Sequence, residues 1–150
     1  YLILSRFIDQ DKDEQKFNAL VNKKRESLPI KLQAYERILL FCERINPSKL
    51  LLRVNPIGND TNSYLHLLIS NIEQEFEHNL TQQIYMSDEC WTVIVTAKNA
   101  TIQMIRRTNM SDRVDTANKL REVIMNDLMD KQSPSSVALS YIKNEVKYLF

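Results

Sequence analysis

A single glycine, Gly58, is present among the 150 residues of this chain. Loops that bind phosphate, and the sharp turn that carries a hydrolase nucleophile, need more than one glycine so that the backbone can turn tightly or approach a phosphate. The sequence therefore excludes dinucleotide-binding, P-loop and nucleophile-elbow sites. Tight hairpins also favour glycine, so its scarcity disfavours a sheet-rich fold. An all-α protein is the predicted fold class.

The composition is that of a folded globular protein with almost no net charge. Hydrophobic residues make up 43% of the chain and charged residues 26%, which allows a buried core. The 20 basic and 19 acidic side chains leave a net charge of +1, so no overall field attracts nucleic acid. The two cysteines, Cys42 and Cys90, are typical of reduced core thiols, and the sequence leaves a disulfide open.

Apolar residues at helical spacing predict an irregular bundle of about five to six helices with a protruding N-terminal helix. The densest pattern lies within 27–54, where Leu32, Tyr35, Leu39 and Cys42 share one face. Residues 92–96 are all β-branched, which favours a strand. We predict a helix there because the apolar steps of three and four continue beyond this run. Further helix starts are expected at Asp60 or Thr61, Ser87, Ser111 and Ser133.

The N-terminal region predicts a domain division. Ser27 and Pro29 suit the start of a new helix, which gives a membrane-proximal helix or spacer at 1–26 and a helical domain at 27–150. The first eight residues, YLILSRFI, are apolar but too few to span a bilayer. They are either a helix that docks onto the domain or the end (1–8) of a membrane helix that begins earlier. The basic run KKR that follows favours the cytoplasmic side in the second case.

Several stretches resemble an uncharacterised family of small proteins from Bacteroidota. The similar stretches are LPIKLQAYER (28–37), FCERI (41–45), EFEHNL (75–80), QQIY (82–85) and SDE (87–89). The resemblance covers about 28–98 and implies one N-terminal membrane helix and a soluble helical domain. It carries over no catalytic residue, and we expect no cofactor. It favours a bacterial inner-membrane location with the soluble domain in the cytoplasm.

A charged face with one apolar residue is the first candidate site. Glu36-Arg37 and Glu43-Arg44 stand seven residues apart, with Leu40 between them. Such charges mostly form solvated ladders worth roughly a few tenths of a kcal/mol. The alternative is a docking face in which Leu40 anchors a protein partner or a second copy of the chain.

Glu75 and His78 form an E-x-x-H pair, which places a carboxylate and an imidazole on one helix face as in the metal sites of helical bundles. A single chain lacks a second such pair, since its other histidine is His66. The simpler interpretation is that His78 ends a helix, where a cation suits the dipole. A carboxylate-metal or small-ligand enzyme centred on Glu75 and His78 is the alternative function.

Basic residues gather around the joint between the fourth and fifth predicted helices: Arg106, Arg107, Arg113, Lys119 and Arg121. They could meet the phosphate of a lipid or a nucleic acid. Interleaved acidic residues weaken that field, and the cluster contains no aromatic side chain to stack on a base, so nucleic-acid binding is not expected.

The two thiols offer a catalytic hypothesis. Cys42 lies in an apolar pattern, where desolvation suppresses reactivity. Cys90 follows the predicted helix start at Ser87, where a helix dipole lowers a thiol pKa, so it is the better candidate for a reactive thiol.

Taken together, the patterns in this sequence favour a non-enzymatic interaction or scaffold module tethered to the cytoplasmic face of the inner membrane.

Overall fold

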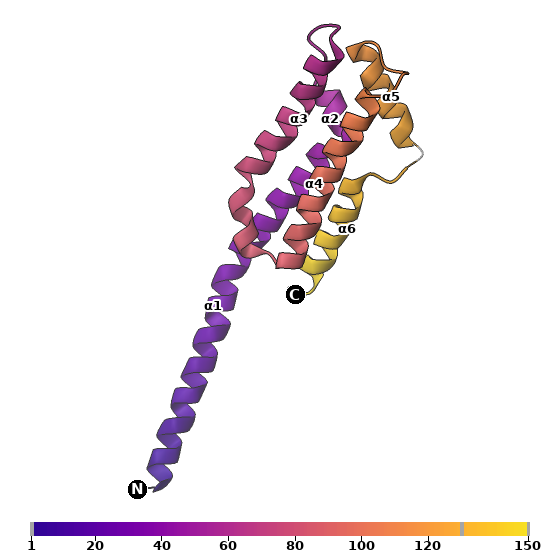
Figure 1. The fold of residues 1–150 in the computed structure, drawn as a ribbon. Coiled ribbons are helices and arrows are strands. Elements are labelled where there is room, and N and C mark those ends of the chain that lie inside the picture. The colour runs from indigo at the N-terminus through magenta and orange to yellow at the C-terminus, as the bar shows by residue number, and fades with distance from the viewer. Residues whose placement is uncertain (1, 130, 150) are drawn as a thin grey trace. The chain divides into compact units, whose positions relative to one another are not determined.

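The computed structural model describes residues 2–129 and 131–149, which form six α-helices and one 3-10 helix and contain no strand (Figure 1). The predicted all-α class is confirmed, and an irregular helical bundle describes the fold. The helices are α1 (Leu2–Ile45), α2 (Pro47–Arg53), α3 (Thr61–His78), η1 (Leu80–Tyr85), α4 (Asp88–Asn109), α5 (Ala117–Met129) and α6 (Pro134–Lys147).

The chain divides into two compact units, Tyr1–Ala34 and Tyr35–Phe150. The first unit consists of the N-terminal part of α1. Its apolar side chains between Leu2 and Ile8 are 52–80% exposed. None of the helices in the described ranges has the length and apolar content that a membrane-crossing segment requires. The division predicted between residues 26 and 27 stays a prediction.

The predicted start of a new helix at Ser27 is wrong, because α1 continues through Pro29. Proline removes one hydrogen bond from the helix and presses its ring on the preceding turn, but both effects are local. The lysine, leucine, glutamine and alanine residues that follow Pro29 are good helix formers, so the helix continues past the proline.

Capping side chains explain where α3 and α4 begin. Asp60 Oδ2 accepts a hydrogen bond from the Ser63 N–H at 3.1 Å, and Ser87 Oγ accepts one from the Cys90 N–H at 3.1 Å. Each bond satisfies a backbone donor that the first helical turn leaves without a partner. The helix starts predicted at Asp60 and Ser87 are therefore confirmed.

The fifth helix begins later than predicted. Ser111 Oγ accepts a hydrogen bond from the Arg113 N–H at 3.3 Å within a turn, and α5 begins only at Ala117. Thr116 provides the cap, since its Oγ1 accepts from the Lys119 N–H at 3.1 Å. Serine and aspartate side chains compete for backbone hydrogen bonds, which favours a turn over a helix in this segment.

The β-branched run at 92–96 is helical and lies within α4. Ile94 is completely buried while Thr92 and Thr96 are exposed, as expected for one face of a helix. Thr92 Oγ1 also donates to the Asp88 carbonyl at 2.9 Å, one turn earlier. Burial of one helix face thus overrides the β-propensity of the run.

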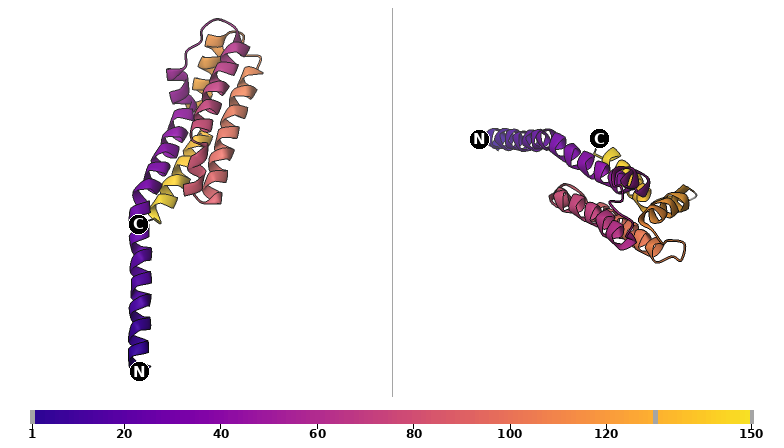
Figure 2. Two further views of the ribbon diagram at one scale, coloured as in Figure 1. Left: turned by 90° about the vertical axis from the view of Figure 1, so that its left-hand side faces the viewer. Right: turned by 90° about the horizontal axis from the view of Figure 1, so that it is seen from above.

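Helix α4 is central to the second unit, because it packs against α3, α5 and α6. Helices α3 and α4 run side by side in opposite directions, as the left view in Figure 2 shows. Among the predicted core positions, Tyr35 and Cys42 are buried, whereas Leu32 and Leu39 are half-buried. The largest fully buried side chains are Ile38, Phe41, Ile45, Leu50, Leu51, Leu68, Ile72, Ile94, Ile105, Leu120, Ile124 and Ile142.

Candidate functional site

A surface hollow of about 270 Å³ lies between the last turns of α1 and the C-terminal end of α3. It brings together three residues of the predicted docking face and both residues of the E-x-x-H pair, which are far apart in the sequence. The predicted residues Glu36 and Glu43 do not line it, and Glu43 pairs with Lys49. The lining residues are Arg37, Leu40, Phe41, Arg44, Glu75, His78 and Asn79.

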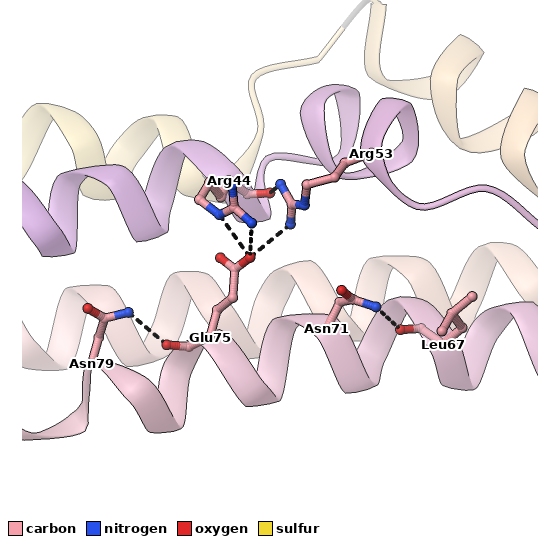
Figure 3. Close-up of polar contacts among 6 residues, drawn as sticks. All are labelled: Arg44, Arg53, Leu67, Asn71, Glu75 and Asn79. Carbon is pink, nitrogen blue, oxygen red and sulfur yellow. Dashed lines mark hydrogen bonds and ion pairs between the residues drawn. The ribbon is translucent and has the colours of Figure 1, made fainter.

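One carboxylate at the edge of the hollow serves two guanidinium groups (Figure 3). Glu75 Oε1 accepts from Arg44 Nε at 2.8 Å and lies 2.7 Å from its Nη2. Arg53 Nη2 lies 3.0 Å from the same oxygen. The bond to Glu75 raises the pKa of Arg44, while burial lowers the pKa of Arg53. Both arginines remain cations at neutral pH, so the ion-pair cluster carries a positive excess.

Glu75 and His78 do not form a shared site, because Glu75 is held in ion pairs and His78 is exposed. Glu75 is held by Arg44 and Arg53, and Asn79 Nδ2 donates to the Glu75 carbonyl at 2.8 Å where α3 ends (Figure 3). His78 is exposed in the last turn of α3. Within residues 2–129 and 131–149, no group of three or more His, Cys, Asp or Glu side chains is placed to hold a metal ion.

Aromatic packing supports the floor of the hollow. Phe41 is 1% exposed, and its ring centroid lies 6.0 Å from that of Phe76. The Phe76 ring stacks on Trp91 at 5.6 Å and is covered by Lys98, whose Nζ lies 4.2 Å from the ring centroid. Above this fixed floor, Leu40 is 59% exposed. The hollow thus joins an apolar surface to a rim of arginines.

The five predicted basic residues mostly have partners within the chain. Arg113 pairs with Asp127 at 3.1 Å, and Lys119 lies 3.7 Å from Glu122. Arg121 Nε donates to the Leu51 carbonyl at 3.2 Å and so joins α5 to α2. These contacts weaken the field available to an anion. Arg106 and Arg107 are exposed in the last turn of α4, where Arg107 lines a separate hollow of about 350 Å³.

A second polar cluster, which no pattern in the sequence predicted, joins α1, the start of α4, and α6. Tyr35 Oη donates to Glu145 Oε2 at 2.7 Å, and Ser87 Oγ donates to Glu145 Oε1. Burial acts to raise the pKa of Glu145, but hydrogen bonds from Ser87, Tyr35 and Cys90 outweigh it and lower that pKa. The only signal in the sequence was an acidic residue, Glu145, three residues after the apolar Ile142, which is buried in the structure.

Comparison with models of known protein families shows to which family this chain belongs. A family model described as a family of unknown function (DUF7935) matches residues 1–149. The chain belongs to the DUF7935 family. The predicted membership of an uncharacterised family is thereby confirmed. No curated protein and no solved structure matches this DUF7935 chain.

Both cysteines of this DUF7935 protein are free thiols buried in the bundle. Burial is the main reason that the pKa of Cys42 and the pKa of Cys90 are each raised to about 12. A thiol in that state is protonated at neutral pH and is a poor nucleophile. The expectation that a helix dipole activates Cys90 is wrong, because desolvation and the nearby Glu145 carboxylate dominate.

We expect both native thiols to react with a disulfide reagent at neutral pH about a hundredfold or more slowly than in guanidinium chloride, since the thiolate is the reacting form. Stopped-flow absorbance measures both rates. Ser70→Cys, at an exposed position on α3, is the control and should react rapidly in the folded protein. Rapid reaction of two thiols in the folded wild type would contradict their burial.

Proposed function

We propose that this DUF7935 protein is a non-enzymatic interaction module that binds a partner protein through the hollow between α1 and α3. The exposure of Leu40, at 59%, beside Arg37 and Arg44 is the observation that carries this proposal. A leucine placed above a fixed aromatic floor can be fully desolvated by a partner without any rearrangement of the bundle. Burying the exposed part of this leucine side chain is worth about 1–2 kcal/mol, which is typical of an interface contact.

The charges around the hollow favour an acidic partner. Arg37 and Arg44 line the hollow together with one carboxylate, Glu75, and that carboxylate is also paired with Arg53 outside the hollow. An acidic side chain on the partner would meet Arg37 and Arg44 while an apolar neighbour covers Leu40. Such complementary charges speed association and exclude basic partners more than they add affinity. The chemistry expected of the partner is therefore an apolar residue beside an acidic one.

The same protein, we propose, comes from Bacteroidota and is held at the cytoplasmic face of the inner membrane through its N-terminal segment. Support for this tether comes from the resemblance of residues 28–98 to a membrane-anchored family. Exposed Lys23 and Arg25 follow in the chain, and basic residues beside a membrane segment favour the cytoplasmic side.

A photo-reactive amino acid at position 40 of the full-length protein tests the proposed docking site. In native membranes we expect irradiation to give one discrete adduct with a second protein, because Leu40 lies at the centre of the contact. Arg37→Glu with Arg44→Glu should reduce that adduct at least about tenfold, since both changes reverse the rim charge. Immunoblotting with mass spectrometry measures the adduct and identifies the partner.

The control is the same photo-reactive group at Val137, which is 55% exposed on α6. It should give no adduct with the same partner. An equal yield from positions 40 and 137, or no adduct from position 40, would refute the docking site. Release of the full-length protein from membranes by high salt alone would refute the tether, because apolar insertion does not depend on salt.

A further inference from the structure

The N-terminal part of α1 is a long helix whose apolar side chains lack contacts that bury them. Ile3 is 78% exposed, Phe7 72%, Phe17 67% and Leu20 65%. In the described residues between Leu2 and Gln33, no side chain is buried. Helices in water draw most of their stability from packing an apolar face, so a helix of this kind is expected to have a partner. The choice lies between a lipid surface, a different protein and a second copy.

The spacing of the apolar residues favours another helix as the occupant. Ile3 and Phe7 are followed two heptads later by Phe17 and Val21, and Leu28 occupies the next equivalent position. These positions belong to one series with alternating steps of four and three residues, which is the heptad pattern of a coiled coil. From Asp9 to Glu26, seven of the eight outward positions are polar, and Ala19 is the exception.

The charges beside this stripe favour a second copy of the same chain in parallel orientation. Arg6 and Asp11 are both exposed and flank the stripe on opposite sides, five residues apart. That is the spacing at which flanking residues pair across a parallel, in-register coiled coil. Two symmetric Arg6–Asp11 pairs would then form. Gln10 would face Gln10 of the second copy, where two amides can hydrogen-bond and specify the register.

We propose that residues 3–28 of α1 pair with the same residues of a second copy in a parallel two-stranded coiled coil. The pairing does not depend on the proposed docking hollow, whose residues lie outside this segment. Polar residues at the interface positions Gln10 and Glu14 make the dimer weak. In particular, Glu14 of one chain would lie opposite Glu14 of the second chain, and two like charges at an interface position repel.

Two matched substitutions test this interface by its register. Glu14→Leu removes the repulsion and adds apolar surface at an interface position, so the dimer should become about tenfold tighter or more. Glu26→Leu makes the same chemical change at an outward position and should alter the dissociation constant by less than about twofold. Sedimentation equilibrium of the 150-residue chain measures both constants.

Single cysteines test the orientation. Val21→Cys should form a disulfide between two chains within minutes of mild oxidation, because position 21 faces itself in a parallel, in-register pair. Glu26→Cys should form it far more slowly. Non-reducing electrophoresis separates the products, and the buried Cys42 and Cys90 do not compete.

Three results would overturn the proposal. The first is that Glu14→Leu stays monomeric at about 100 μM, where even weak coiled coils associate. The second is that Glu26→Leu tightens the dimer as much as Glu14→Leu, which indicates non-specific apolar association. The third is a monomer that binds vesicles of phosphatidylethanolamine and phosphatidylglycerol and loses this binding with Phe17→Asp, which assigns the stripe to lipid. The Leu40 adduct does not depend on any of these results.

Discussion

Replacing Phe41 with alanine is expected to lower the free energy of unfolding by about 3–5 kcal/mol. The side chain is 1% exposed, and its ring packs against Phe76 beneath the hollow. Its loss removes apolar burial and leaves a cavity that the rigid helices α1 and α3 only partly fill. Urea unfolding followed by far-UV circular dichroism measures the difference.

Leu40→Ala is the matched control for this prediction, since Leu40 is the preceding residue of the same helix but is 59% exposed. Its cost should stay within about 1 kcal/mol, because surface substitutions have small effects. A loss of less than about 1 kcal/mol for Phe41→Ala would contradict the packing of α1 on α3, since a ring buried at that contact cannot be removed so cheaply. The floor of the proposed docking site would then be unsupported as well.

Replacing Glu145 with alanine is expected to cost about 2–3 kcal/mol at neutral pH. The carboxylate accepts hydrogen bonds from Tyr35 and Ser87, and so holds α1, α4 and α6 together. Tyr35 is 5% exposed, and its hydroxyl would be left without this acceptor. Glu122→Ala, which removes an exposed pair with Lys119 at 3.7 Å, is the control and should cost less than about 1 kcal/mol.

The cost of Glu145→Ala should depend on pH in a defined direction. The folded protein lowers the pKa of Glu145, so the carboxylate stabilises the fold fully above its unfolded pKa of about 4.3. That contribution is lost as the pH falls through the lower folded pKa. The difference in unfolding free energy between wild type and Glu145→Ala should therefore narrow between about pH 6 and pH 3. A difference that stays constant over this range would refute the role of the charged form.

Local patterns predicted the fold class of this DUF7935 protein well. The scarcity of glycine and the helical steps of apolar residues favour helices throughout, and 92–96 follows that pattern despite its β-branched side chains. Asp60 and Ser87 were identifiable as caps because a cap acts on backbone groups only two or three residues away. The exposure of Leu40 was also predictable from local spacing, because charged residues lie one turn before and one turn after it on the same helix face.

Predictions failed where a choice depended on contacts between distant residues or on competition between local signals. Ser27 and Pro29 resemble a helix start, yet α1 continues through them, and Ser111 forms a turn while Thr116 caps α5. Cys90 occupies a helix start that would activate an exposed thiol, but packing buries it. A pattern along one helix does not reveal which neighbouring helix will cover it.

The amino-acid sequence alone determined that this chain is helical, where most of its helices start and which residue types its surfaces present, since these depend on hydrogen bonds and side-chain spacing within a few turns. Only the tertiary structure decided that Glu75 lies between Arg44 and Arg53 and that Glu145 binds Tyr35 and Ser87. It also placed Leu40 beside the end of α3. Those contacts join residues from different helices, and helix packing rather than local propensity brings them together.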